Sequence, residues 1–163
     1  MRRISETARR RIEMQGFIGL DDEYLAEIEP WLRLSPAICT TWAAVATGAG
    51  SAPALFALVP FAVGGALLRN HPFDVIYNHG LRHLLKTRPL PRYGAPRRFA
   101  CAFGSVWVAM TGTAFAVGWT NVGLALGAVM VVMGSIQVLT GFCIPSFTYQ
   151  RVLARRSRRP ATV

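Results

Sequence analysis

Histidine and cysteine are the side chains of this sequence that could bind a metal or act as nucleophiles, and there are three of each. His71, His79 and His83 share one polar segment, and His79 and His83 are four residues apart, so one helix face would present both. Such a pair can bind a metal ion, and Asp74 would add a carboxylate. Alternatively the histidines are polar anchors at a lipid headgroup interface, and the sequence favours this because it has no HExxH motif.

The cysteines allow a second kind of chemistry. Cys39, Cys101 and Cys143 each lie near one end of a long apolar stretch, and those ends are predicted to lie on the same side of a membrane. A thiol-redox or metal cluster with the histidines is one interpretation, with Cys101 and Cys143 as candidate catalytic residues. Small packing side chains are the alternative, since a thiol in apolar surroundings is unreactive. A disulfide is disfavoured in a reducing compartment.

The elements that would position these residues follow from the charge map. All 18 Lys and Arg residues lie outside two apolar stretches, Pro36 to Leu68 and Phe99 to Ile144, and neither stretch contains Asp or Glu. About 20 residues cross a bilayer core, so each stretch is too long for one span. Turn-forming residues at 48–53 and 118–121 divide them. The sequence thus predicts an all-α membrane protein with four transmembrane helices as two hairpins, plus interfacial amphipathic helices.

The predicted organisation has five parts. Because positive charge marks the cytoplasmic side, both termini and the central loop are expected there, in a bacterial inner membrane. The four spans are expected at about 35–47, 53–68, 99–118 and 121–142. A helix capped by Asp21 or Asp22 and one beginning near Pro72 are both predicted to lie at the membrane surface. The parts are a basic segment with an interfacial helix (1–34), hairpin 1 (35–68), an amphipathic helix with a Pro-rich connector (69–98), hairpin 2 (99–144) and a basic tail (145–163).

A net charge of +10 would suggest nucleic acid for a soluble protein. Here the arginines flank predicted spans, where they set orientation and contact anionic lipid, so we expect lipid and no nucleic acid as partner. The acidic N-terminal segment is also expected to pair with arginines of the central loop. No cofactor is predicted. The residues expected to contact headgroups are Arg97, Arg98, Arg151, Arg155 and Arg156.

Small residues predict how the spans pack. In lipid, helices associate where small side chains allow close approach. The last span has such a stripe, which we expect to face Ser105, Ala109 and Thr113 of the third span, with a homodimer face as the competing use. Gln137 is expected to form an interhelical hydrogen bond. The stripe consists of Gly123, Gly127, Gly134 and Gly141.

Several motifs resemble one bacterial membrane protein family, catalogued as domain of unknown function 4395. They are residues 70–74 (NHPFD), 77–78 (YN), the Pro-Arg steps before the third span, and 141–146 (GFCIPS) closing the fourth. The resemblance covers about residues 69–150. It implies an inner-membrane protein of several helices, and it carries no activity and no catalytic residues to this chain.

Two function classes remain open from the sequence. One is a non-catalytic scaffold or accessory subunit that docks a protein partner or anionic lipid. The other is a membrane enzyme using Cys101, Cys143, His79 and His83. A transporter is disfavoured because the spans contain no ionisable residue of the kind that marks a transport pathway.

Overall fold

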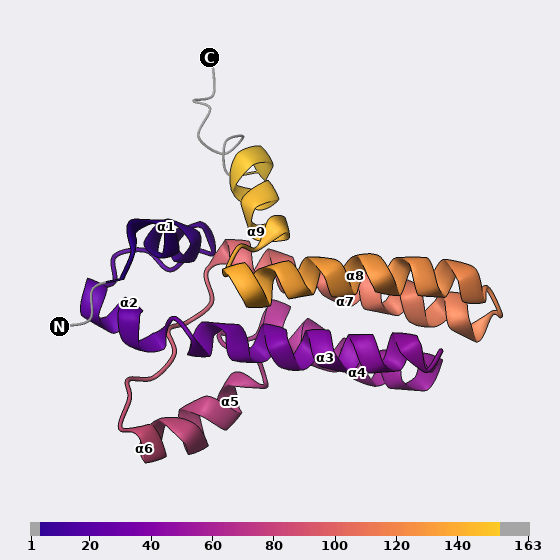
Figure 1. The fold of residues 1–163 in the computed structure, drawn as a ribbon, viewed down its shortest axis with the longest axis horizontal. Helices are drawn as coiled ribbons and strands as arrows, with labels where there is room; N and C mark the ends of the chain where they lie inside the picture. Colours follow the sequence, from indigo (N-terminus) through magenta and orange to yellow (C-terminus); the bar gives the residue numbers. More distant parts are fainter. Residues whose placement is uncertain (1–3, 154–163) are drawn as a thin grey trace.

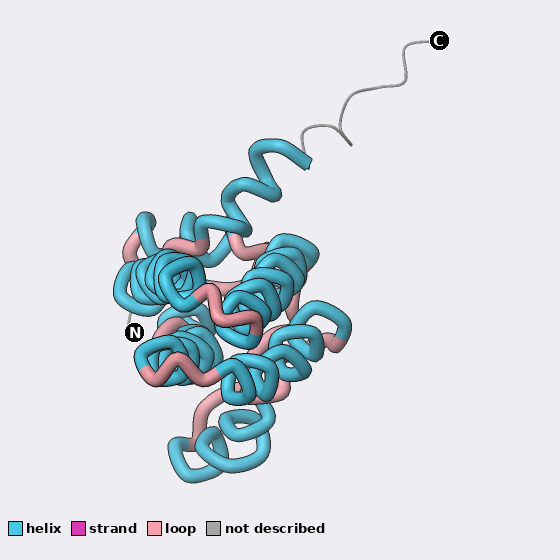
Figure 2. Tube along the Cα trace, turned by 90° about the vertical axis from the view of Figure 1, so that its right-hand side faces the viewer, coloured by secondary structure: helices cyan, strands magenta, loops and turns pink. Residues whose placement is uncertain are grey.

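Four helices form an antiparallel bundle in the computed structural model, which describes residues 4–153 and is all-helical within them. They are α3 (Leu34–Gly48), α4 (Ala52–Leu67), α7 (Ala95–Ala116) and α8 (Thr120–Thr140). Helix α3 turns into α4 and α7 into α8, and the two hairpins lie side by side (Figure 1). Figure 2 looks along the bundle, where α4 packs on α7 and α3 on α8. The predicted all-α class and the positions of the two breaks are confirmed.

The two hairpins differ in length. Helices α7 and α8 have 22 and 21 residues and are long and apolar enough to cross a membrane. Helices α3 and α4 have 15 and 16 residues, or about 24 Å at about 1.5 Å per residue. Two helices are therefore long and apolar enough to span, not the four that the sequence predicts, because the turn at Gly48 to Ser51 divides the first stretch into two helices of fewer than 18 residues. The α3–α4 turn accordingly stops short of the α7–α8 turn in Figure 1.

In each hairpin, one tryptophan joins the two helices by a hydrogen bond. The indole Nε1 of Trp42 in α3 donates to the carbonyl oxygen of Ala54 in α4 at 2.9 Å, and Trp107 in α7 donates in the same way to Leu126 in α8 at 2.9 Å. A buried indole N–H needs an acceptor, and a carbonyl of the neighbouring helix satisfies it. Each bond fixes the register of its hairpin.

The glycine stripe of α8 packs against α3, which corrects the prediction that it faces α7. A Cβ on Gly127 would overlap Thr47, and one on Gly134 would overlap Thr40. Arg33 lies opposite Gly141, where an added Cβ would be 3.4 Å from its guanidinium. From one of these contacts to the next, the position moves seven residues along each helix, in opposite directions, as antiparallel helices require. Only Gly123 faces α7, against the ring of Phe115.

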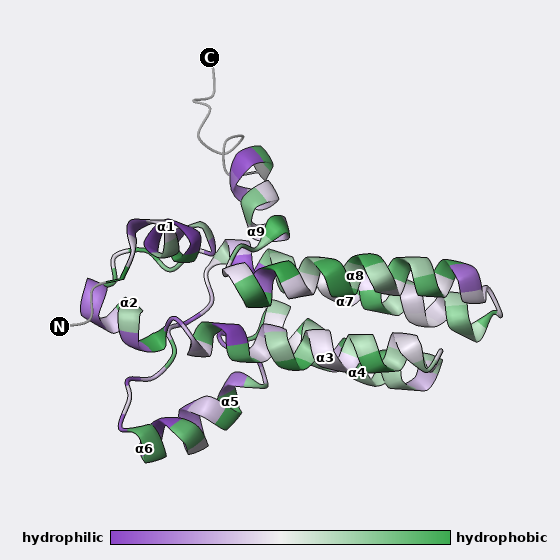
Figure 3. Cartoon of the chain, viewed as in Figure 1, coloured by the Kyte–Doolittle hydropathy of each residue, from purple (hydrophilic) through white to green (hydrophobic). Residues whose placement is uncertain are grey.

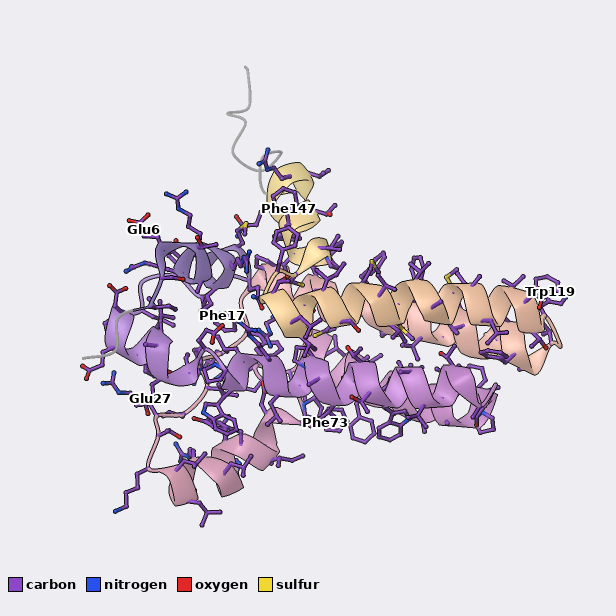
Figure 4. All side chains as sticks on the ribbon, viewed as in Figure 1. Glu6, Phe17, Glu27, Phe73, Trp119 and Phe147 are labelled. Carbon is purple, nitrogen blue, oxygen red and sulfur yellow. The ribbon has the colours of Figure 1, made fainter. Side chains whose placement is uncertain are left out.

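The remaining described elements form what we term the cap: residues 4–33, 69–94 and 143–153. It lies at the end of the bundle opposite the two turns (Figure 1). Every described Asp, Glu, Lys and Arg lies in the cap or in the first turn of α7. Figure 4 shows Glu6 and Glu27 at this end and Trp119 at the other. The helical elements of the cap are α1 (Glu6–Met14), α2 (Asp22–Ile28), η1 (Trp31–Arg33), α5 (Asp74–Ile76), η2 (Tyr77–Leu81), α6 (Arg82–Leu85), α9 (Ile144–Thr148) and η3 (Tyr149–Leu153).

The cap has its own apolar core, and this corrects the prediction that α2 is an interfacial helix. Asp21 caps α2 as expected, since its side chain accepts from the backbone N–H of Tyr24 at 2.7 Å. The apolar side of α2, however, packs on protein and not on lipid: Leu25 and Ile28 are 1% and 0% exposed. The other buried members of this core are Ile12, Phe17, Leu32, Tyr77, Leu90 and Tyr93.

The helix of the central loop is interrupted by a π-helical turn, η2, between α5 and α6. A π turn inserts an extra residue and rotates the following face, so the predicted apolar side does not stay together. Tyr77 is fully buried while Ile76 and Leu84 are exposed. In Figure 1 this segment slopes away from the bundle at the cap end, whereas α9 leaves the bundle at a steep angle on the opposite side.

Arginines of the cap bind the carbonyl ends of the bundle helices. Arg33 donates to Val138 and Leu139 and Arg11 to Thr140, all in the last turn of α8. A cation suits the C-terminal end of a helix dipole. The predicted pairing of the acidic N-terminal segment with the central loop is confirmed, because Arg88 forms ion pairs with Asp21, Glu23 and Glu27 at 3.6, 3.8 and 3.3 Å. These contacts tie the cap to the bundle and to itself.

Candidate functional site

A cavity of about 160 Å³ lies among the four bundle helices near the cap. The polar residues of its lining lie toward the cap, where α3 and α7 meet the segments that carry His71 and Tyr93. The deeper lining from α4, α7 and α8 is apolar and includes Met130 and Met133. The lining side chains that could bind a ligand or react are Ser35, Cys39, His71, Tyr93, Arg97, Cys101 and Gln137. Gln137 thus lines the cavity.

His71 is the histidine that the fold places in this cavity. It is 4% exposed, and its Nδ1 accepts the backbone N–H of Phe73 at 3.3 Å. In the neutral ring the proton is then on Nε2, which lies 3.8 Å from the Sγ atom of Cys39. The carboxylate of Asp74 accepts from the backbone N–H of His71 at 3.2 Å and from the Ser35 hydroxyl at 2.5 Å. Asp74 therefore fixes the loop that carries His71.

Two glycines of α4 make room for this loop. A Cβ on Gly64 would lie 2.7 Å from the ring of Pro72. A Cβ on Gly65 would lie 2.9 Å from the Sγ atom of Cys101 and 3.1 Å from the Nε2 atom of His71. All three distances are shorter than a normal contact, so only glycine fits at the two positions. The imidazole and the thiol of Cys101 therefore face the same gap beside α4.

Burial should make His71 a source of acid sensitivity. Desolvation lowers the pKa of His71 to about 4, below its unfolded value of about 6.5. Above that value the ring is neutral in both states; as pH falls toward about 4 the unfolded state binds the proton first, so stability is lost across this window. We expect a loss of about 2–3 kcal/mol at most. Thermal unfolding at pH 7 and pH 4.5 should show a smaller drop for His71→Gln than for the native protein, and equal drops would contradict this.

Arg97 is a buried cation at the start of α7. It is 3% exposed, donates to the Oε1 atom of Gln15 at 2.7 Å and to the carbonyl of Leu32 at 2.5 Å, and lies over the rings of Tyr93 and Phe17 at 4.6 and 5.3 Å. Burial raises the pKa of Tyr93 above its ordinary value, so its hydroxyl remains protonated. Arg97 is thus bound inside the protein and not to the headgroups that the sequence predicts.

The other predicted headgroup contacts differ in their surroundings. Arg98 is exposed and its guanidinium caps α4, donating to Ala66 and Leu67 at 2.8 and 3.2 Å. Arg151 is exposed on η3 and lies 4.9 Å from the ring of Phe147, which Figure 4 shows on the C-terminal helix. Arg155 and Arg156 lie outside the described residues. Arg98 and Arg151 are therefore exposed, and their contact with lipid headgroups stays a prediction.

The structure does not bring the predicted metal set together. His79 and His83 are exposed on η2 and α6, whereas Asp74 is buried against Ser35. Among residues 4–153, no group of three His, Cys, Asp or Glu side chains is placed to hold a metal. Cys143 is buried at the start of α9, where its sulfur accepts from the Ser146 hydroxyl at 3.1 Å.

Reasoning from the sequence did not single out Tyr93, grouped His71 with the two exposed histidines, and assigned Arg97 to lipid headgroups. His71 is nonetheless the histidine nearest an apolar stretch. The signal that could have found it was the pair Gly64-Gly65, because two adjacent glycines in an apolar helix indicate a close approach. Arg97 and Tyr93 carried no such signal, since a basic residue before a span usually faces water.

The comparisons with known proteins agree with this chain's motifs. A family model described as a domain of unknown function, DUF4395, matches residues 29–154, so the chain belongs to this family. The match begins just before α3 and includes the whole bundle and cavity. No curated protein and no solved structure matches the chain.

Proposed function

We propose that this protein is an integral inner-membrane protein of four spans, with both termini and the cap in the cytoplasm, and that it acts as a non-catalytic scaffold or accessory subunit. The observation that carries the proposal is the separation of charge: every described charged residue lies at the cap end, and the two turns are uncharged. Positive charge stays on the cytoplasmic side. Figure 3 shows the hydrophilic cap and the apolar bundle.

The surface of the bundle supports a lipid environment. In an apolar segment of 18 residues within α7, only 28% is buried inside the protein. In the corresponding segment of α8 the buried share is 11%. Water would face the rest, and soluble monomers rarely expose apolar area on this scale. A short first hairpin is accommodated by local thinning of the bilayer. The exposed apolar side chains of the bundle include Val45, Phe56, Val106, Met110, Val122, Leu124, Val129, Val132 and Leu139.

The cap would supply the docking surface. Helix α9 leaves the bundle at a steep angle near the cap end (Figure 1), and carries the exposed Arg151 and the half-buried Phe147 and Tyr149 along its length with η3. Aromatic and basic side chains together are typical of the headgroup level. Anionic lipid is the first partner that this surface fits. The segment α5–α6, with the exposed Leu84 and Leu85, extends away from the bundle and suits a cytoplasmic protein.

The enzyme alternative with Cys101, Cys143, His79 and His83 is not supported by the geometry. The two histidines lie on the exposed side of the cap, and the sulfur of Cys143 accepts a hydrogen bond from the Ser146 hydroxyl. A nucleophile needs its base within hydrogen-bond reach. No arrangement of these four residues provides that among the described residues.

Cysteine labelling tests the orientation. We expect an impermeant thiol reagent applied to intact cells to label Ala49→Cys and Asn121→Cys at the two turns, because both positions are exposed and face outward. Arg10→Cys on α1, also exposed, should be labelled only after the membrane is opened. The native protein is the control for background, since its cysteines are buried or half-buried. Labelling of Arg10→Cys in intact cells would show that the orientation is opposite to the one proposed. Labelling at only one turn would show that only one hairpin crosses the membrane.

A further inference from the structure

Sulfur is concentrated in the central cavity. The chain has three cysteines and five methionines, and two of each line this one space: Cys39 from α3, Cys101 from α7, and Met130 and Met133 from α8. Met130 and Met133 are three residues apart, so they share one face of α8. Three helices therefore bring four soft donor atoms to a single cavity.

The donor set selects one class of metal. Thiolate and thioether ligands favour Cu(I) over harder ions. A structural zinc site takes about four nitrogen, oxygen or thiolate ligands, and the described residues place no three such side chains together. Cu(I) needs fewer ligands, and two thiols supplemented by a thioether suit it.

The electrostatics of the cavity fit a thiolate-bound Cu(I). Two thiolates and one Cu(I) carry a net charge of minus one, which a low-dielectric site would disfavour unless a cation were near. Arg97 lines the same cavity from the first turn of α7, where the helix dipole is also positive. The buried guanidinium thus offers the compensating charge.

His71 has a positioning role in this arrangement. Its Nδ1 accepts the Phe73 N–H, which leaves the proton on Nε2 facing the sulfur of Cys39 at 3.8 Å. The Nε2–H donates to that sulfur, and donation strengthens when the sulfur is a thiolate. The ring therefore orients a ligand and is not itself bound to the metal.

We propose that the cavity is a Cu(I) site in which Cys39 and Cys101 are the thiolate ligands, Met130 and Met133 supply a thioether, and His71 and Arg97 hold the ligand set. Binding exchanges the two thiol protons for one Cu(I) and involves no electron transfer. This inference goes beyond the scaffold role and does not depend on it.

Competition for Cu(I) tests the site. The detergent-purified protein, reduced and kept anaerobic, is titrated with Cu(I) against the chromophoric chelator bathocuproine disulfonate. We expect about one tightly held Cu(I) per chain. Cys39→Ser and Cys101→Ser should each weaken binding by more than about 100-fold, and His71→Gln by about 10-fold, as outer-shell changes do.

Matched variants separate this site from other thiols and imidazoles. Cys143→Ser and the double variant His79→Gln/His83→Gln should bind Cu(I) as the native protein does, because neither set lines the cavity. If a serine variant fails to fold, the volume-conserving double change Met130→Leu/Met133→Leu still tests the thioether and should weaken binding by about 10-fold. Equal affinity in Cys39→Ser and the native protein, or no Cu(I) retained against the chelator, would overturn the proposal.

Discussion

Replacing Gly134 by leucine should destabilise the bundle by about 2–4 kcal/mol, because the new side chain would enter the space of Thr40 on α3. Neither helix can retreat easily. Arg33 binds the last turn of α8 one heptad further on, and the contact of Gly127 with Thr47 holds the other side. The expected measurement is thermal unfolding in detergent, where the midpoint should fall by several degrees.

Val132→Leu is the matched control, since Val132 lies two residues away on the same helix and is 58% exposed. It should change stability by less than about 0.5 kcal/mol. Gly134→Ala should fall between the two, because its single methyl group still overlaps Thr40. If Gly134→Leu and Val132→Leu unfold at the same temperature, the glycine stripe does not set the distance between α3 and α8.

The ends of the bundle helices could be predicted from local chemistry. The turn residues from Gly48 to Ser51 and at Gly118 end their helices, and Gly118 has a positive φ of 81°. An apolar run without charged residues marks the helices on either side of each turn. The same local rules predict the cap of α2 at Asp21 or Asp22, and Asp21 is the residue that caps it. These features depend on neighbours in sequence, so a single chain contains the information.

Which faces meet could not be predicted in the same way. The glycine stripe on α8 can be seen in the sequence. Its partner cannot, because Thr40 and Thr47 recur in the opposite direction on α3, about 100 residues away along the chain. The π turn at Tyr77–Leu81 broke the 3.6-residue period on which the loop helix was judged. The cavity residues come from segments that meet only after the hairpins dock.

Burial of Arg97 was the least predictable feature and leads to the second large effect. Arg97→Met should lower the stability by about 3–5 kcal/mol, because it leaves the Oε1 atom of Gln15 and the carbonyl of Leu32 without their donor and removes two ring contacts. Removing a buried charge recovers a desolvation penalty, which opposes this loss. The loss prevails because two buried acceptors would be left without a donor, and because the carboxylate of Asp74, whose charge stabilises the Arg97 guanidinium, would lose that cation.

Two further variants decide whether the guanidinium or only its charge matters. Arg97→Lys keeps the charge but cannot reach both acceptors with a planar fork, so it should recover less than half of the lost stability. Arg98→Met removes a neighbouring arginine whose guanidinium caps α4 at the surface, and should change stability by no more than about 1 kcal/mol. Thermal unfolding of the three variants at pH 7 measures the order. If Arg98→Met were as destabilised as Arg97→Met, exposure would not distinguish the two arginines, and the buried guanidinium would not be what joins α7 to the cap.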